Sequence, residues 1–266
     1  MNKKREKLLN EMIAIYIRDG KPLGSESLRL ELQYADFSIS SATIRNYFKA
    51  LGDEGILAQP HISSGRIPTN NALKNYWRNK IDISIPLEIS SLQSVANASE
   101  KYGIFCGIRL NQNEILDEVV NFRDKYIILL FRENAADSSV AVESSEAILP
   151  HSSHLYDFLQ EMLYHNIEEI RFVARSVCAN LLFYKLDFSG NAFNFGYKFL
   201  EISDSVLLME ILKSHIFYRL KNGFHFFKDG YLGLIQDISF DKRDGKMFIF
   251  GKLSCNYASF YSEIAS

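Results

Sequence analysis

One stretch of sequence decides the fold: Ser38-Ile39-Ser40-Ser41-Ala42-Thr43-Ile44-Arg45-Asn46-Tyr47-Phe48-Lys49-Ala50-Leu51. Its apolar residues Ile44, Phe48 and Leu51 recur at the spacing of one face of an α-helix. Ser40, just ahead of them, is a natural N-cap. The opposite face carries a hydroxyl, a guanidinium, an amide and an amine, from Ser41, Arg45, Asn46 and Lys49. Because these groups can reach base edges or phosphates of DNA, the stretch predicts a recognition helix.

A short basic hairpin is predicted directly after this helix. Two strands, at about 56–59 and 66–68, bracket the turn Ser63-Ser64-Gly65. Ahead of the recognition helix, one helix is predicted over about 3–18, where Asp19-Gly20-Lys21-Pro22 ends it, and a shorter one from about Ser25. Three helices followed by a two-stranded hairpin are typical of a winged helix-turn-helix.

The charge of the chain is unevenly distributed. The net charge of the 266 residues is −2. Residues 1–80 contain 13 Lys and Arg against 8 Asp and Glu, whereas residues 81–266 contain 17 against 24. A basic head on an acidic body is typical of a nucleic-acid-binding unit joined to a module of another kind, although chance clustering gives the same numbers.

Nothing in the sequence predicts secretion or membrane insertion. Three cysteines, Cys106, Cys178 and Cys255, lie far apart without C-x-x-C spacing, which favours reduced, buried thiols. The basic start of the chain lacks an apolar core of signal-peptide length, and no stretch approaches the ~20 apolar residues of a membrane span. We therefore expect a cytoplasmic protein.

The rest of the chain predicts an α+β unit. Strands are expected at about 103–110, 114–122, 125–132, 140–148, 183–188, 193–200, 231–240 and 246–256. Helices are expected at about 70–80, 88–102, 152–164, 167–180 and 205–220. Together they predict a single central antiparallel sheet. The expected domains are a DNA-binding domain over 1–80, a linker over 81–87 and an α+β domain over 88–266.

Three motifs resemble the HrcA family of heat-inducible transcription repressors. They are Gly20-Lys21-Pro22-Leu23-Gly24-Ser25, Ser41-Ala42-Thr43-Ile44-Arg45-Asn46 and Gln59-Pro60-His61-Ile62-Ser63-Ser64-Gly65-Arg66-Ile67-Pro68-Thr69. They stand in the family's order and spacing, and the resemblance is strong over residues 4–80 and weaker beyond. It implies a winged helix followed by a GAF-like α+β domain into which a dimerising segment is inserted. Because the chain is shorter than typical members, we expect that inserted segment to be short.

The resemblance also implies a function. Members of the family are homodimeric repressors that bind an inverted-repeat operator upstream of chaperone genes, and a GroEL-type chaperonin keeps them active. The expected partners are therefore double-stranded DNA with a palindromic operator, a second copy of the chain and a GroEL-type chaperonin, with no cofactor. The sequence leaves open whether heat acts through the chaperonin or melts the repressor locally. One departure from the family is Tyr47, where an acidic residue is usual.

The expected DNA contacts follow from the helix and the hairpin. In the major groove, Arg45 would pair with a guanine and Asn46 with an adenine. Hydroxyls in the first turns of helices and a lysine one turn further along would contact the backbone, from Ser25, Ser40, Ser41, Thr43 and Lys49. In the hairpin, Arg66 would enter the minor groove, with phosphate contacts supported by His61, Ser63 and Ser64.

Simpler interpretations of these residues stay open. The pair Arg45-Asn46 can be an ordinary solvated helix face, Ser63-Ser64 can serve only the turn, and Thr43 can pack or cap the helix without touching DNA.

Other chemistry has less support. The spacing of His151 and His154, with His165 further on, allows a metal site, but histidines in a loop and at a helix start explain it better. No G-x-S-x-G motif, Walker loop or dinucleotide fingerprint is present, so we expect neither an enzyme nor a metal protein. Two alternatives remain: a winged-helix regulator gated by a small-molecule ligand of the distal domain, and an enzyme or chaperone-binding adaptor whose N-terminal module contacts proteins.

Overall fold

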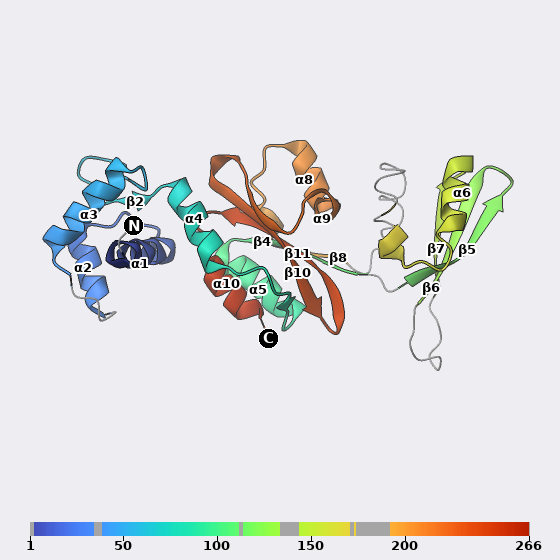
Figure 1. Ribbon diagram of the computed structural model, residues 1–266, viewed down its shortest axis with the longest axis horizontal. Coiled ribbons are helices and arrows are strands. Elements are labelled where there is room, and N and C mark those ends of the chain that lie inside the picture. The colour runs from blue at the N-terminus through green and yellow to red at the C-terminus, as the bar shows by residue number, and fades with distance from the viewer. Residues whose placement is uncertain are drawn as a thin grey trace.

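The structure is a computed structural model that describes residues 3–34, 39–111, 114–133, 144–170, 173 and 192–265. The chain combines helices with sheets that are almost entirely antiparallel, so the α+β class predicted from the sequence is correct. Three units follow one another along the long axis (Figure 1): a helical head at one end, a central unit built on a sheet, and an inserted unit at the far end. The head spans residues 3–80, the central unit residues 81–111 and 192–265, and the inserted unit residues 114–170.

The head contains the elements expected from the sequence, in the expected order. They are α1 (Lys3–Asp19), α2 (Ser25–Tyr34), α3 (Ser41–Asp53), β1 (Leu57–Ala58), β2 (Ile67–Pro68) and α4 (Asn70–Lys80). Strands β1 and β2 pair antiparallel and form the base of a hairpin, which we call the 57–68 hairpin. Helix α3 buries Ile44, Phe48 and Leu51, the three residues on its predicted apolar stripe.

The central unit is built on a sheet that the chain visits before and after the inserted unit. Its strands are β3 (Leu87–Glu88), β4 (Phe105–Leu110), β8 (Ala192–Phe195), β9 (Gly223–Phe226), β10 (Tyr231–Phe240) and β11 (Arg243–Lys252). The order across the sheet is β3-β10-β11-β4-β8, with β9 also paired to β10. All these pairs are antiparallel except β3 with β10.

Both faces of the central sheet are covered by hydrophobic cores. Successive residues of a strand point to opposite sides of the sheet, so each strand contributes to both cores. On β11, Met247 and Ile249 join one core, whereas Phe248 and Phe250 join another. Helices α5 (Leu92–Tyr102) and α10 (Tyr257–Ile264) supply apolar residues to the first core. The second core lies against α8 (Ser205–Leu212) and α9 (Ile216–Arg219).

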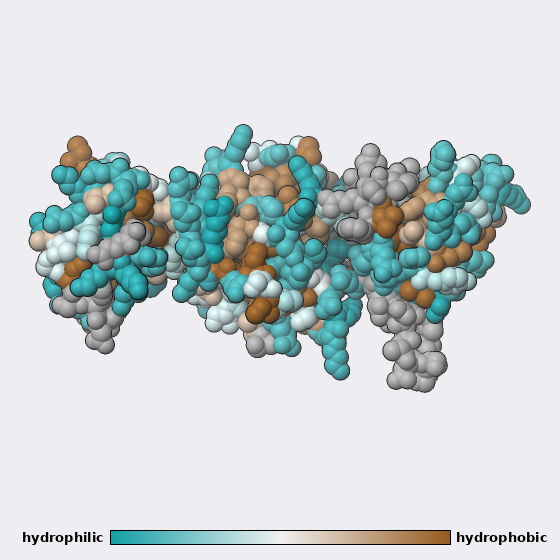
Figure 2. Space-filling model, in the orientation of Figure 1, coloured by the Kyte–Doolittle hydropathy of each residue, from teal (hydrophilic) through white to brown (hydrophobic). Residues whose placement is uncertain are grey.

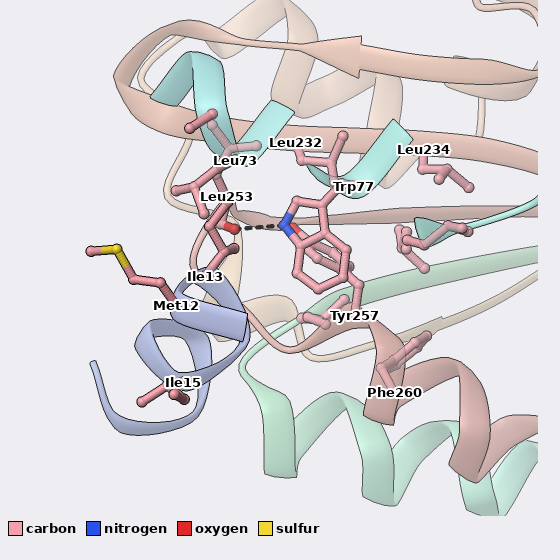
Figure 3. Packing of buried hydrophobic residues seen from close by; sticks show 14 of the residues in the cluster. Met12, Ile13, Ile15, Leu73, Trp77, Leu232, Leu234, Leu253, Tyr257 and Phe260 are labelled. Atoms are coloured by element: carbon pink, nitrogen blue, oxygen red, sulfur yellow. Dashed lines mark hydrogen bonds between the residues drawn. The ribbon is translucent and has the colours of Figure 1, made fainter. Parts of the chain in front are cut away.

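The core of the head and the first core of the central unit are one continuous cluster. Figure 3 shows residues of α1, such as Met12 and Ile13, beside Trp77 of α4 and residues of the central unit. The indole Nε1–H of Trp77 donates a hydrogen bond of 2.7 Å to the carbonyl oxygen of Leu253, and the ring meets that of Tyr257 edge-on at 5.1 Å. The head is therefore packed onto the central unit and does not hang from a flexible tether.

The prediction of a single sheet is wrong. The chain leaves the central sheet after β4 and returns to it at β8, and between them β5 (Glu114–Phe122), β6 (Tyr126–Glu133) and β7 (Ser144–Pro150) form a separate three-stranded sheet. Helix α6 (Ser153–Glu161) packs on this sheet and completes a hydrophobic core that belongs to the inserted segment alone. The inserted segment is thus a unit with its own core.

One prediction near the junction of head and central unit is corrected. Helix α5 begins at Leu92 and not at residue 88, since Ser91 caps it and Leu87–Glu88 form β3 against Ile238 and Ser239. In the segment expected as a linker, residues 81–87, Ile81 is buried in the shared core, whereas Ile85 is 72% exposed.

The C-terminal elements also differ in detail from the predictions. The strand expected over 193–200 ends at Phe195, because Gly196 adopts a left-handed conformation and a 3-10 turn, η1 (Tyr197–Phe199), follows. The helix expected over 205–220 breaks where Ser214 has a positive φ. Strand β11 lies earlier than predicted; β9, the turn η2 (Lys228–Gly230) and α10 were not predicted.

Several predictions fall outside the described residues. They are Ser38, Cys178, the first part of the strand at 140–148, most of the helix at 167–180 and the strand at 183–188. Among the helices that the structure describes, none has both the length and the apolar character needed to span a bilayer.

Candidate nucleic-acid interface

Helix α3 presents a polar row to solvent. Arg45, Asn46 and Lys49 are exposed because Ile44 and the rest of the apolar stripe fix the opposite face of the helix in the core of the head. Within the described parts of the chain, the side chains of Asn46 and Lys49 make no hydrogen bond or ion pair. These groups are therefore available to a partner.

The first turn of α3 is held by its own hydroxyl groups. The Oγ of Ser40 accepts a hydrogen bond of 3.1 Å from the backbone N–H of Thr43, and the hydroxyls of the two residues lie 2.9 Å apart. This is an N-cap, which satisfies one of the free N–H groups at the helix start. The hydroxyls of Ser40 and Thr43, two of the four predicted to contact phosphates, are thus engaged with each other at the helix start. The partial positive charge of the helix end remains directed outward.

A carboxylate that the sequence reasoning missed lies beside α3. Glu26 on α2 accepts a hydrogen bond of 2.7 Å from the Oγ of Ser41 and one of 2.6 Å from Arg29. The hydrogen bonds from Arg29 and then Ser41 lower the pKa of Glu26 to about 2, and the charge of Arg45 acts in the same direction. Glu26 therefore stays ionised and places a negative charge near Arg45. The i,i+3 spacing of Glu26 and Arg29 in a predicted helix was the available signal.

The loop of the 57–68 hairpin is braced by side chains. The Oγ of Ser64 accepts a hydrogen bond of 2.9 Å from the backbone N–H of His61 and donates one of 2.7 Å to the carbonyl oxygen of His61. The side-chain amide of Gln59 donates to the carbonyl oxygens of Ile62, at 2.8 Å, and Ser64, at 3.1 Å. Ser64 therefore serves the turn, whereas Ser63 and the ring of His61 are exposed.

The hairpin is fixed to the segment between α1 and α2. Leu23 and Arg66 exchange two backbone hydrogen bonds, of 2.9 and 2.8 Å. A Cβ on Gly65 would lie 2.4 Å from the backbone of Leu23, so this position requires glycine for a close approach. The sequence placed Gly65 in the predicted turn, and the structure adds the close approach to Leu23 as the constraint on this position. Arg66 is half-buried. Ser25, which begins α2 two residues after Leu23, is also half-buried.

The structure thus brings the predicted residues of α2, α3 and the hairpin to one end of the molecule, the end away from the inserted unit (Figure 1). Of the predicted contact residues, six are exposed: Ser40, Arg45, Asn46, Lys49, His61 and Ser63. The hydroxyls used internally are those of Ser40, Ser41, Thr43 and Ser64. The arrangement offers cations and one amide on a rigid frame, which is suited to a polyanion with readable edges.

Other candidate sites have less to offer. No cluster of three or more potential metal ligands occurs among the described residues, so His151, His154 and His165 are not brought together with further ligands there. Burial raises the pKa of the Cys106 thiol far above its ordinary value, and Cys255 is shifted in the same direction for the same reason. These two thiols are therefore poor nucleophiles.

A cleft of about 450 Å³ lies beside α8 in the central unit. Its walls include Leu207, Phe227, Tyr231 and Phe250, and Tyr231 stacks on Phe250 at 5.1 Å between ring centres. The hydroxyl of Tyr231 donates a hydrogen bond of 2.5 Å to Glu201, at the same cleft.

Comparison with known proteins identifies relatives along the whole chain. Residues 77–266 match the family described as the HrcA C-terminal domain. The heat-inducible transcription repressor HrcA of Helicobacter pylori strain 26695 is 30% identical over 269 residues, which cover 98% of this chain and 94% of that protein. The protein of the same name from Helicobacter pylori strain J99 is 29% identical over the same shares of both chains. That of Thermotoga sp. strain RQ2 is 34% identical over 137 residues, or 48% of this chain and 40% of that one.

A solved structure shares the fold. The crystal structure of a hypothetical protein at 2.2 Å resolution aligns with a TM-score of 0.54 over 99% of this chain and 95% of that chain. The sequence identity is 16%, so this likeness concerns the fold alone. The matches to the HrcA C-terminal domain and to the Helicobacter pylori proteins extend well beyond residue 69, where the quoted sequence motifs end.

Proposed function

Because this chain belongs to the HrcA family of heat-inducible transcription repressors, we propose that it represses heat-shock genes by binding an inverted-repeat operator as a homodimer. The observation that carries the proposal is the exposed row of Arg45, Asn46 and Lys49 on α3, next to the braced 57–68 hairpin. We interpret the head as a winged helix-turn-helix spanning residues 1–80, with α3 as recognition helix and the hairpin as wing. The domain after residue 87 is then the GAF-like domain of the family, carrying the inserted unit.

In this proposal α3 reads the major groove. Arg45 would pair with a guanine and Asn46 with an adenine, while Lys49 contacts the DNA backbone. The hydroxyls of Ser40 and Thr43 keep the first turn in shape, and the N–H groups of that turn would face a phosphate. Glu26 supports the reading geometry by holding Ser41 and by attracting Arg45. Arg66, His61 and Ser63 would contact the neighbouring minor groove and its phosphates.

The homodimer is best supported by the outer face of the three-stranded sheet. One face of this sheet is covered by α6, but Phe122, Tyr126 and Ile148 on the other face are 46%, 49% and 51% exposed. Phe122 lies opposite Tyr126, and Ile148 lies opposite Ile128, so these residues form one continuous apolar patch. An antiparallel sheet with one solvated face is normally polar on that face. A second copy of the chain would cover the patch by two-fold symmetry.

Operator binding is tested first by titrating palindromic operator fragments with the purified protein at several salt concentrations. Binding that depends on the palindrome and weakens with salt is expected, because released counterions accompany each phosphate contact. In the variant Arg45→Ala, specific binding should weaken by about 1–3 kcal/mol, since one bidentate base contact is lost. Arg243→Ala, an exposed arginine of the central unit, is the matched control and should bind as the parent does. Equal binding by both variants would refute the assignment of Arg45.

The dimer is tested separately by sedimentation equilibrium. A charge in the middle of the apolar patch, as in Ile148→Asp, should convert the dimer to a monomer and weaken operator binding. Val206→Asp alters a residue on α8 that is 64% exposed and lies outside the patch, so it serves as control. If Val206→Asp dissociates the dimer and Ile148→Asp does not, the interface lies on the central unit instead.

The heat response is proposed to run through a GroEL-type chaperonin, as the family membership implies. Operator binding by the purified repressor should then fall after mild heating and return only when the chaperonin and ATP are added. Reversible loss and recovery without chaperonin would instead mean that the repressor senses temperature itself.

A second candidate function is a repressor gated by a small molecule, and the aromatic cleft beside α8 favours it. Its volume of about 450 Å³ and its aromatic walls fit the range of small-ligand sites. A metabolite screen by thermal shift tests this candidate. A compound that raises the melting temperature of the parent, but not that of Leu207→Trp, which fills the cleft, would support gating.

A further inference from the structure

The tip of the 57–68 hairpin exposes an isoleucine completely. Ile62 is 100% exposed, more than any other large apolar side chain among the described residues. Apolar side chains project from the hydrophilic surface of the head above the hairpin (Figure 2). Single exposed apolar residues are common on protein surfaces, so exposure alone carries no meaning. What distinguishes Ile62 is the way in which its backbone is held.

The backbone on both sides of Ile62 is fixed by side chains. Gln59 donates hydrogen bonds to the carbonyl oxygens of Ile62 itself and of Ser64, and Ser64 bonds both backbone groups of His61. The loop is further anchored at Gly65 and Arg66, which contact Leu23 through the backbone. An isoleucine is also stiff at χ1, because it is branched at Cβ. The side chain is therefore presented in a nearly fixed direction before any partner is met, which lowers the entropic cost of binding.

The surroundings of Ile62 indicate what the partner is. The flanking side chains of His61 and Ser63 are exposed, and Arg66 lies at the base of the same loop. A stiff apolar tip between groups that can contact phosphates matches the way in which minor-groove proteins insert an aliphatic side chain beside a base step. A protein partner would instead be expected to need an apolar patch, and Ile62 has no exposed large apolar neighbour in the described loop.

We propose that Ile62 is an apolar wedge, which enters the minor groove beside each operator half-site and partly unstacks one base step. This inference rests on the proposed DNA-binding function and adds a specificity determinant to it. The wedge favours a step that opens easily, such as TA or CA/TG, and so reads the deformability of DNA outside the sequence contacted by α3. His61 and Arg66 hold the flanking phosphates while the step opens.

The experiment compares the parent with Ile62→Ser on operator DNA, followed by fluorescence anisotropy. Footprinting first locates the minor groove that the hairpin covers, and 2-aminopurine is placed at the step found there. The parent should raise the 2-aminopurine fluorescence on binding, because an unstacked base is less quenched. Ile62→Ser should bind about tenfold more weakly and leave the fluorescence low. The salt dependence of its binding should equal that of the parent, because no cation has been removed.

Controls separate the wedge from the proposed function and from the fold. Ile85→Ser removes an isoleucine that is 72% exposed after α4, outside the head, and should leave binding and fluorescence unchanged. Since the side chain of Ile62 is fully exposed, the melting temperature of Ile62→Ser should match that of the parent. If the parent binds no operator at all, the proposed function fails. If the parent binds the palindrome and Ile62→Ser binds it equally well with the same fluorescence change, the wedge alone is refuted.

Discussion

The head and the inserted unit are attached to the same central unit in opposite ways. The head shares one hydrophobic core with it, in which Met12 and Leu51 belong to the same cluster as Leu234 and Phe260. The inserted unit has a separate core, built around Leu129 and α6. Near its junction with the central sheet the described contacts include polar ones, among them Arg109 with Glu168 at 3.9 Å.

This difference indicates which parts of the molecule move together. The head and the central unit are expected to unfold together, because separating them would expose the apolar surface of their shared core to water. A unit with its own core can unfold or reorient locally while the rest stays folded. In the proposed repressor, the head would keep its orientation on the central unit, whereas the proposed dimer contact would belong to the part that opens more easily.

The largest expected effect comes from breaking the joint of the head. Trp77 is 1% exposed, and its ring contacts those of Tyr76 and Tyr257. Trp77→Ala should lower the free energy of unfolding by about 3–5 kcal/mol, because it leaves a cavity in the shared core. Urea unfolding followed by circular dichroism measures this loss. An unchanged unfolding midpoint would mean that head and central unit do not share a core in solution.

A milder variant separates packing from hydrogen bonding at the same joint. Trp77→Phe keeps an aromatic ring but removes the N–H that donates to the carbonyl oxygen of Leu253. Its cost should be smaller than that of Trp77→Ala, since most of the apolar volume is retained and the main loss is one buried hydrogen bond.

The second expected effect is confined to the inserted unit. Leu159 of α6 is fully buried in the separate core, and Leu159→Ala should destabilise that core by about 2–5 kcal/mol. Trp77 is the single tryptophan of the chain, so its fluorescence reports on the head joint alone. The fluorescence transition should stay in place while the circular dichroism gains an earlier phase. If fluorescence and circular dichroism shift together, the core of the inserted unit and the shared core unfold as one, and the proposed difference between the two regions is refuted.

The head was predictable because its signals are local. Each signal depends on residues only a few positions apart in the sequence. Examples are the apolar stripe of Ile44, Phe48 and Leu51, the cap at Ser40 and the turn at Ser63-Ser64-Gly65. Such signals specify elements without knowledge of distant partners. The missed groups of the site, Glu26 and Gln59, act through contacts to Ser41 and to the hairpin loop that the sequence does not reveal.

The residue pattern predicted the strands of the inserted unit but not their separate sheet; only the family resemblance implied an insertion. Strand β5 was placed at residues 114–122 from its residue pattern, which is the range observed. Alternation along a strand shows that one face is buried, but it does not name the neighbouring strand. The pairing of β4 with β8, across the whole insertion, is a long-range choice of this kind. The error of a single sheet follows from that limit.

The reach of the family resemblance was underestimated for a related reason. The sequence resemblance is strong only up to residue 80, whereas residues 77–266 match the HrcA C-terminal domain. The core around β10 and β11 is built from many apolar positions, and each of these accepts several hydrophobic residue types. No short motif therefore marks it. A single sequence shows these positions only as ordinary hydrophobic residues.

The smallest expected effect compares one serine in each region. Ser40 stands at the N-cap of α3 and accepts a hydrogen bond from Thr43, whereas Ser152 stands at the N-cap of α6 without a side-chain cap bond. Ser40→Ala should cost about 1 kcal/mol, because an N–H at the helix start loses its acceptor. Ser152→Ala should be close to neutral. Both are measured by urea unfolding, the first through Trp77 fluorescence and the second through circular dichroism. Because the shared core couples α3 to Trp77, the cap variant should shift the whole fluorescence transition. If Ser40→Ala changes only the circular dichroism, α3 unfolds locally and the head is less firmly joined than its packing indicates.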